Sequence, residues 1–362
     1  MDGIVVKTGN RMIDYLRKMV EREASDLHLA AGSPPKIRID EELMNLEDVP
    51  LSSDQVKELA FSLLTPQQAE RFDREKELDM AFGIEGLSRF RVNVFMQRGT
   101  VAVAIRTLPF KIRNFEELGL PVPVVTELCK QPKGLVLVTG ATGSGKSTTL
   151  ASMIHKINTD RRCHIITVED PIEYVFRNDK ALINQREIGE DSQSFAQALR
   201  RILRQDPDVI LVGEMRDLET IRAALNIAET GHLVFATLHT SDAVTTINRV
   251  IDVFPSGQQQ QVRIQLSFVL MAILAQQLIP KAQGKGRVLA SEVLIANHAV
   301  RSLVREAKVH QIYSVIQTGQ KEGMRTMNHC LYELYTRRLV TLENALSRTT
   351  EPEELQRLIQ RQ

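Results

Sequence analysis

The 362-residue sequence contains no tryptophan, only three cysteines and almost no excess charge of either sign. Aromatic residues make up 5% of it, which argues against a stacking platform for single-stranded nucleic acid. The 46 basic residues balance 45 acidic ones to a net charge of +1, so bulk charge does not indicate nucleic-acid binding, although a local basic patch stays open. The cysteines form no C-x-x-C pair, which excludes a sequence-local zinc ribbon and indicates a reducing compartment.

No apolar run is long enough to cross a membrane. The most apolar window, residues 266–275, has about half the length that a spanning helix needs and is flanked by glutamines, so we expect a buried helix there. Residues 1–10 lack the apolar stretch of a signal peptide. We therefore expect a soluble, cytoplasmic protein without direct membrane insertion, which reaches a membrane only through a partner.

The composition that is present is typical of a folded protein. Apolar residues make up 43% and charged residues 25%, and the length predicts two or three domains. Apolar residues recur at helical spacing over 12–20, and residues 36–39 alternate as a strand does. Residues 89–96 and 101–105 alternate on either side of a four-residue turn at 97–100, which predicts a hairpin.

The pattern changes after residue 107. Residues 108–123 contain three prolines and a glycine, which predicts a linker. Short runs that are apolar on both faces then alternate with helical stretches, as in a parallel sheet covered on both sides. These runs are residues 135–138, 165–168, 209–212 and 233–236. Helices are expected to dominate beyond Gln258. We therefore expect an α/β protein with domains at 1–107 and 124–362.

Residues 140–147 read GATGSGKS and match the phosphate-binding pattern G-x-x-x-x-G-K-[ST] between an expected strand and an expected helix. The glycines let backbone N–H groups turn inward around a phosphate, and the helix directs its positive end at the same place. Lys146 is expected to reach the β- and γ-phosphates of ATP, and Ser147 to bind Mg²⁺. The alternative is a structural glycine-rich turn. The predicted nucleotide-binding residues are Gly140, Thr142, Gly143, Ser144, Gly145, Lys146, Ser147 and Thr148.

A second strand, in the segment DVILVGE at 208–214, ends in a glutamate. Its carboxyl end is expected beside the phosphate loop, where open α/β sheets bind ligands, so Glu214 can orient or deprotonate the attacking water. Gly213 stands where many such ATPases have a Mg²⁺-binding aspartate, so we expect the metal to be held mainly by Ser147, the nucleotide and water. The alternative for Glu214 is a surface carboxylate at a strand end.

Two further strand ends carry polar side chains. Residues 169–173 contain three carboxylates, which repel one another unless a cation or a water network lies among them; a solvated turn is the alternative. His232 and His239 bracket the last of the predicted strands. A lone histidine is most often structural, but a pair at the ends of one strand in a phosphate-binding domain can sense the γ-phosphate.

Together these segments resemble the type II/IV secretion ATPases, which are hexameric RecA-like motors. The segments that carry the resemblance read GATGSGKS, ITVEDPIEY, DVILVGEMRD and TGHLVFATLHT, in that order. Within the family, ASDLHLAAGSPPKIRID near the start and AVRSLVREAKVHQIYSVIQTG near the end resemble the ATPases that retract type IV pili in twitching motility. The resemblance covers roughly residues 24–331.

The resemblance implies an N-terminal PAS-like α/β domain and a C-terminal RecA-like P-loop ATPase domain with a helical C-terminal part. It implies that Glu214 is the catalytic glutamate, that Glu169 belongs to an acidic box, and that His232 and His239 form a histidine box. Residues 299–306 match, with substitutions, a segment that retraction motors need in cells. The family also places arginine fingers on a hairpin of the first domain.

Arg91 and Arg106 are the arginines expected on that hairpin. With a four-residue turn at 97–100, counting back along the ladder sets Arg91 directly across from Arg106. Like charges facing each other across a strand pair are destabilising, so this arrangement suggests that an anion lies between them. The resemblance supplies the γ-phosphate of ATP as that anion. The alternative is a solvated face with two unrelated arginines.

The sequence therefore predicts a homohexameric ATPase that uses ATP and Mg²⁺, is peripheral to the inner membrane at the pilus base, and binds a membrane platform protein to retract type IV pili. Three cysteines cannot form the four-cysteine zinc module of pilus-extension and type II secretion relatives, which favours retraction. An assembly or type II secretion ATPase stays open as the alternative. So do a nucleic-acid translocase, against which the charge balance counts, and a regulatory module without turnover, against which Glu214 counts.

Overall fold

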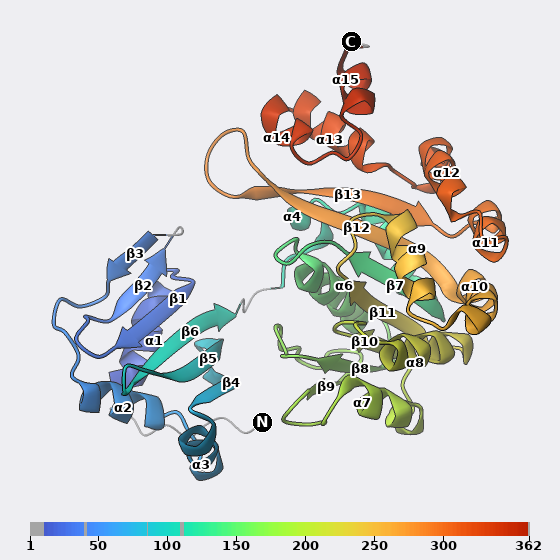
Figure 1. Ribbon diagram of the computed structural model, residues 1–362. Helices are drawn as coiled ribbons and strands as arrows, with labels where there is room; N and C mark the ends of the chain where they lie inside the picture. Colours follow the sequence, from blue (N-terminus) through green and yellow to red (C-terminus); the bar gives the residue numbers. More distant parts are fainter. Residues whose placement is uncertain (1–10, 40–41, 85, 109–111, 361–362) are drawn as a thin grey trace. The chain divides into compact units, whose positions relative to one another are not determined.

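The structure, a computed structural model, describes residues 11–39, 42–84, 86–108 and 112–360 (Figure 1). Residues 1–10, which lack the apolar stretch of a signal peptide, lie outside the described residues. Residues 109–111 of the expected linker also lie outside them. The chain divides into two compact units near residue 111.

The first unit is built on an antiparallel six-stranded sheet with the order β3-β2-β1-β6-β5-β4. Its strands are β1 (Asp26–Ala30), β2 (Lys36–Ile39), β3 (Glu42–Asn45), β4 (Glu77–Ile84), β5 (Ser88–Gln97) and β6 (Thr100–Leu108). Its helices are α1 (Arg11–Glu21), α2 (Ser53–Phe61) and α3 (Pro66–Glu75). Buried residues of the sheet and of the three helices form one hydrophobic core.

The helices of this unit form where the local sequence favours them. The predicted apolar stripe of α1 is buried, and its buried residues are Met12, Tyr15, Leu16 and Met19. Burying each such side chain contributes about 1.5–3 kcal/mol. α2 and α3 each begin at a capping box, with Ser52 and Thr65 as the N-cap residues. In both boxes the glutamine three residues later bonds back to the N-cap N–H, so two otherwise unpaired donors are satisfied.

The β5–β6 hairpin has the predicted register. Its two central turn residues, Arg98 (φ 48°) and Gly99 (φ 76°), both adopt the left-handed conformation that a type I′ turn requires. The ladder that follows pairs Arg91 with Arg106, which confirms the expected juxtaposition. Both arginines are exposed, whereas Phe90, on the other face of the strand, is fully buried.

The second unit contains a seven-stranded sheet with the order β13-β12-β7-β11-β10-β8-β9. Its neighbouring strands are parallel except for β13, which is antiparallel to β12. The strands are β7 (Gly134–Thr139), β8 (His164–Glu169), β9 (Leu182–Glu187), β10 (Val209–Val212), β11 (Leu233–Leu238), β12 (Leu270–Pro280) and β13 (Arg287–Ile295). All four predicted apolar runs are strands of this sheet.

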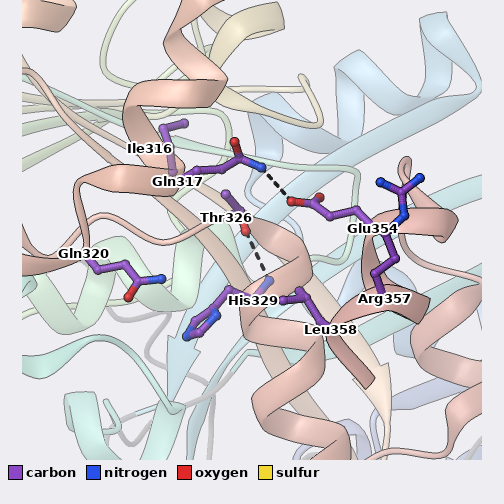
Figure 2. A pocket seen from close by; sticks show the side chains of 8 residues that line it. All are labelled: Ile316, Gln317, Gln320, Thr326, His329, Glu354, Arg357 and Leu358. Carbon is purple, nitrogen blue, oxygen red and sulfur yellow. Dashed lines mark hydrogen bonds between the residues drawn. The ribbon is translucent and has the colours of Figure 1, made fainter. Parts of the chain in front are cut away.

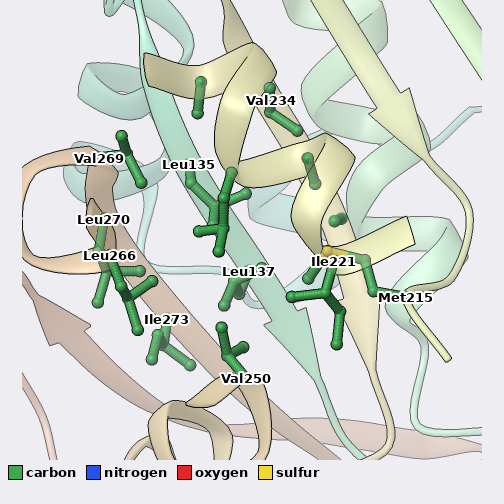
Figure 3. Packing of buried hydrophobic residues seen from close by; sticks show 14 of the residues in the cluster. Leu135, Leu137, Met215, Ile221, Val234, Val250, Leu266, Val269, Leu270 and Ile273 are labelled. Atoms are coloured by element: carbon green, nitrogen blue, oxygen red, sulfur yellow. The ribbon is translucent and has the colours of Figure 1, made fainter. Parts of the chain in front are cut away.

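Helices cover both faces of this sheet, as the alternation of apolar runs and helical stretches predicts. Successive residues of β7 point into different cores: Leu135 and Leu137 into one, Val136 and Val138 into the other. Figure 3 shows part of the first core. Helices that contribute to the first core include α7 (Phe195–Ile202), α8 (Leu218–Glu229), α9 (Ala243–Asp252) and α10 (Ser256–Val269). Helices that contribute to the second are α4 (Phe115–Leu118), α5 (Val122–Lys130) and α6 (Lys146–Asp160).

Two expectations need correction. The window 266–275 is not one buried helix, because α10 ends at Val269 and β12 begins at Leu270, paired with β7. A short run that is apolar all round fits a buried helix and a buried central strand equally well, so its periodicity could not distinguish them. The β12–β13 hairpin therefore interrupts the region where helices were expected to dominate. No helix in the described part of the chain has the length and apolar character to span a membrane.

The expected linker also differs from the structure. Phe115, in α4, and Leu120 are each 5% exposed and belong to the core of the second unit. α5 begins at Val122, within the same segment. From residue 112 on, the proline-containing segment is thus a packed part of the second unit, held by apolar side chains that its prolines obscured in the sequence pattern.

Beyond β13 the chain is helical. The α-helices there are α11 (His298–Arg305), α12 (Ile312–Thr318), α13 (Met327–Thr336), α14 (Leu342–Leu346) and α15 (Pro352–Gln360). Glu292 of β13 is 4% exposed and joins this part to the sheet. Its carboxylate accepts the backbone N–H of Ala243, which starts α9, at 2.8 Å, and that of Met327, which starts α13. Burial raises the pKa of Glu292 to about 7; Asp242 adds to the rise, and the two hydrogen bonds oppose it.

Glu292→Gln should therefore flatten the pH dependence of stability. A carboxyl group with a pKa of about 7 when folded and near 4.5 when unfolded stabilises the fold fully below pH 4.5, and this contribution is lost as the pH rises through 7. Because glutamine cannot ionise, the variant should gain roughly 2–3 kcal/mol on the wild type between pH 5 and pH 8. Urea unfolding at both pH values measures this, with the exposed Glu190→Gln as control. Equal pH slopes for wild type and Glu292→Gln would contradict it.

Candidate nucleotide site

The carboxyl ends of four neighbouring parallel strands bring the predicted side chains to one edge of the second sheet. Across that edge the order is β7, β11, β10 and β8. The phosphate loop follows β7, His239 follows β11, Glu214 follows β10 after one residue, and Glu169 is the last residue of β8. Segments far apart in the sequence therefore meet because parallel strands end on the same side.

The loop from Gly140 to Gly145 has a backbone that requires glycine. Gly143 (φ 78°) and Gly145 (φ 90°) are left-handed, and Gly140 has a φ of 141°. A Cβ on Gly140 would lie only 2.4 Å from the carbonyl oxygen of Gln276. Gly145 is the N-cap of α6 and provides no side-chain hydrogen bond, so the first N–H groups of this helix point toward the loop without a side-chain cap. This is the geometry in which a helix start binds an anion.

The polar groups of the loop fit a phosphate. The Nζ of Lys146 donates to the carbonyl oxygens of Gly140 at 2.8 Å and Ala141 at 3.1 Å, so its ammonium lies directly over the loop. Within the described residues, the buried hydroxyls of Thr139 and Ser144 have no hydrogen-bond partner. Buried hydroxyls are normally paired, so a ligand with acceptor oxygens would satisfy this site.

Glu169 is the buried member of the acidic segment. It is 8% exposed and accepts hydrogen bonds from the Oγ1 of Thr167 at 2.6 Å and the Nε2 of Gln185 at 3.2 Å. Asp170 and Glu173 are exposed. The three carboxylates are therefore not crowded together: two are solvated, and the third is oriented by neutral donors.

Glu214 lies between two basic side chains. Its Oε2 accepts from Arg216 at 2.7 Å, and its Oε1 lies 3.1 Å from the Nε2 of His239. Burial raises the pKa of the Glu214 carboxyl, but Arg216 and His239 together outweigh burial and leave it below its usual value. The backbone beside Glu214 is fixed by the sheet, because Met215 N–H donates to the carbonyl of Thr237 at 3.0 Å.

The glycine before Glu214 has a structural reason. Gly213 N–H donates to the carbonyl of Val168 at 2.8 Å, which brings the ends of β8 and β10 together. A Cβ on Gly213 would lie 3.2 Å from that same carbonyl oxygen and from the Cα of Glu169. Any side chain here, aspartate included, would require the neighbouring backbone to shift by a few tenths of an ångström, which favours glycine at this position.

The structure separates the two predicted histidines. His239 reaches Glu214, but His232 precedes β11 at the opposite edge of the sheet. The six residues of β11 span roughly 20 Å at about 3.3 Å per residue. The Nδ1 of His232 lies 3.1 Å from the carbonyl oxygen of Ile227 and 3.1 Å from the Oγ1 of Thr230. Within one chain, His232 therefore is not brought to the phosphate loop.

The two hairpin arginines of the first unit are not equivalent. Arg106 donates its Nε–H to Asp26 of β1 at 2.8 Å, and Asp26 also lies 3.8 Å from Arg38. For Arg106, the anion expected beside the facing arginines is thus the Asp26 carboxylate of the same chain. Arg91 is exposed, and no acidic side chain in the described ranges forms a salt bridge with it.

Sequence reasoning missed three groups that orient these residues. Arg216 stands two positions after Glu214 inside the quoted segment DVILVGEMRD, and this proximity was the available signal. Gln276 of β12 pairs with Thr149 of α6, with its Nε2 2.9 Å from the Oγ1, and no motif marked it. Asp26 lies in the quoted ASDLH segment, but only the strand order of the first sheet places it beside Arg106.

A pocket of about 310 Å³ lies elsewhere in the second unit, among α12, α13 and α15 (Figure 2). Glu354 spans one side of it and accepts the Nε2–H of Gln317 at 2.7 Å. Thr326 accepts the backbone N–H of His329 as the N-cap of α13. None of the predicted nucleotide-binding residues lines this pocket, so it is distinct from the site at the sheet edge.

Comparison with known proteins gives a consistent result. Residues 2–359 match the family described as "Type II/IV secretion system protein". The chain is 49% identical over 340 residues to the type IV pilus retraction ATPase PilT of Pseudomonas aeruginosa, covering 94% of this chain and 98% of that relative. It is 46% identical over 321 residues to a twitching motility protein of Neisseria gonorrhoeae, covering 89% and 86%. A crystal structure of the pilus retraction motor PilT with bound ADP superimposes with a TM-score of 0.90 at 52% identity, covering 95% of this chain and 98% of that one.

Proposed function

Because this chain belongs to the type II/IV secretion system protein family, we propose that it hydrolyses ATP and uses the energy to retract type IV pili. The observation that carries the proposal is the sheet edge at which the phosphate loop, Glu214 and His239 meet. The likeness over 94% of the chain to a retraction ATPase supplies the mechanical task. It is also the reason to prefer retraction over pilus assembly or secretion.

The phosphates of ATP would lie in the loop of residues 140–148. Backbone N–H groups of the loop and of the first turn of α6 donate to the phosphate oxygens, and the hydroxyls of Thr142, Ser144 and Thr148 add further donors. Lys146 exchanges the loop carbonyls for the β- and γ-phosphates, which are stronger acceptors. Ser147, at the start of α6, would hold Mg²⁺, which would supply positive charge near the phosphate oxygens.

Glu214 would act on the attacking water. The water oxygen forms a bond to the γ-phosphorus while the bond to the ADP oxygen breaks, and the water proton passes to the Glu214 carboxylate. His239, 3.1 Å from Glu214, would contact the γ-phosphate, and the buried Glu169 would order the adjoining strand end. His232, the other member of the proposed histidine box, would act away from Glu214 and His239.

The finer architecture is also proposed. The order β12-β7-β11-β10-β8, with the phosphate loop after β7, supports a RecA-like P-loop ATPase domain that includes the packed segment from residue 112 on. The antiparallel order β2-β1-β6-β5-β4 with its packed helices supports a PAS-like domain at 1–107. The active form would be a homohexamer at the cytoplasmic side of the inner membrane that binds a pilus platform protein and does not bind nucleic acid.

Lys146→Ala should abolish hydrolysis and strongly weaken nucleotide binding, because it removes the charge that faces the β- and γ-phosphates. Glu214→Gln should retain ATP binding while turnover falls by about two orders of magnitude or more. Steady-state phosphate release and nucleotide titration separate the two effects. The exposed Glu190→Gln, with a carboxylate removed elsewhere in the same unit, should behave as wild type. Wild-type turnover in Glu214→Gln would exclude its role in activating water.

Arg91→Ala should lose most ATPase activity while nucleotide binding at the phosphate loop persists. An arginine finger contributes about 10³–10⁵ in turnover where it completes charge stabilisation. Arg106→Ala should also lose activity, and the double variant should lose less than the sum, because either loss disables the same site. Arg98→Asn is the control: it removes a charge from the same hairpin, and asparagine tolerates the positive φ there. Normal turnover in Arg91→Ala and Arg106→Ala would show that these arginines take no part in hydrolysis and are unrelated residues of a solvated hairpin face.

Deleting the gene tests the mechanical task. Loss of a retraction motor should give hyperpiliated cells without twitching motility, because pili still assemble but no longer shorten. Electron microscopy of surface pili and a surface-motility assay measure this, with the wild-type gene restored as control. Cells without pili would instead identify an assembly motor. Unchanged pili with a secretion defect would identify a secretion ATPase.

A further inference from the structure

Both oxygens of the Glu214 carboxylate have a partner. Arg216 contacts Oε2 at 2.7 Å through its Nη2, and His239 lies 3.1 Å from Oε1. The side chain of Glu214 is only 19% exposed, whereas that of Arg216 is 70% exposed. The guanidinium is therefore far more exposed than the carboxylate it contacts, and it occupies one of the two carboxylate oxygens.

This ion pair opposes the proposed function of Glu214. A carboxylate that is to accept a proton from water works better with a pKa nearer the working pH, and Arg216 is the main group that lowers the pKa of Glu214 against the effect of burial. The pairing with Arg216 makes Glu214 a weak base. If Glu214 activates water during turnover, Arg216 must therefore leave it at one stage of the cycle.

Two acidic groups in the described part of the chain act on Arg216. Glu214 forms an ion pair with it, and Asp170, directly after β8, contributes only through its charge. Both carboxylates lie at the sheet edge that carries the phosphate loop. A guanidinium forms two parallel hydrogen bonds with a phosphate, so an additional phosphate at this edge is a strong competitor for it. ATP brings the γ-phosphate there, and ADP does not.

We propose that Arg216 is a phosphate-binding residue that exchanges partners during the cycle. It pairs with Glu214 when the site holds no γ-phosphate and transfers to the γ-phosphate when ATP binds, which frees Glu214 to accept the proton of the attacking water. After phosphate release, Arg216 returns to Glu214 and returns the site to a state of low activity. The proposal rests on the catalytic role of Glu214 given above.

The exchange makes a specific thermodynamic prediction. If Glu214 and the γ-phosphate compete for Arg216, then Glu214→Gln should tighten binding of a non-hydrolysable ATP analogue and leave ADP binding unchanged. The expected gain is about two- to fivefold, the size of a partly exposed ion pair. In the Arg216→Ala background the part of this gain that comes from the exchange should be lost, because nothing remains to be exchanged.

Isothermal titration of AMP-PNP and ADP, with Mg²⁺, into wild type, Glu214→Gln, Arg216→Ala and the double variant tests this. Removing a negative charge near the phosphates also relieves simple repulsion, but that gain would persist without Arg216. A gain for AMP-PNP that is as large in the Arg216→Ala background as in wild type, or one that is equal for AMP-PNP and ADP, overturns the exchange. Arg216→Lys should keep part of the gain. Arg200→Ala, which removes another exposed arginine of this unit, should leave the full gain in place.

The two proposals fail in different ways. If Glu214→Gln turns over ATP at the wild-type rate, the catalytic role of Glu214 is wrong and the exchange loses its basis. If Glu214→Gln is inactive but shows no gain that depends on both the γ-phosphate and Arg216, the catalytic role stands and the exchange is wrong.

Discussion

Parallel strand pairing is the constraint on which the site depends. β7 pairs with β11, β11 with β10, and β10 with β8, all in the same direction, so the segments that follow these strands emerge at one edge. Each strand is buried on both faces and is held between two cores, which fixes its ends. The phosphate loop, His239, Glu214 and Glu169 therefore need no contacts of their own to be brought together. The same constraint keeps His232 away, since it lies at the other end of its strand.

Both units hold an arginine against a carboxylate of their own chain. In the first unit Arg106 pairs with Asp26, and in the second Arg216 pairs with Glu214. Each arginine is largely exposed while its carboxylate is largely buried, so the guanidinium can move away without repacking a core, but the carboxylate is then left with fewer partners. Charge pairs of this kind would suit the proposed nucleotide cycle, because they can break without unfolding their surroundings.

Much of this arrangement is predictable from the sequence, and the exceptions have physical causes. The phosphate loop, the four buried strands and the Arg91–Arg106 register follow from local pattern, because glycine spacing, apolar runs and a two-residue turn each specify local geometry. The window 266–275 was mistaken for one helix because burial on all sides removes the periodicity that distinguishes helix from strand. Asp26 and Arg216 were missed as partners because their contacts depend on strand order or loop geometry, which the sequence pattern alone does not provide. The packed segment from residue 112 on was obscured by its prolines.

The most direct measurement of the central claim, that chemistry at this sheet edge powers pilus shortening, is retraction speed in cells compared with turnover in vitro. Fluorescently labelled pili would be followed in a deletion strain that carries wild type, Arg216→Lys, His239→Gln or Glu214→Gln, each expressed at the same level. We expect retraction speed to fall in the same order as the ATPase rate of the purified variants and to vanish in Glu214→Gln. Retraction at wild-type speed by a variant that does not hydrolyse ATP would contradict the account.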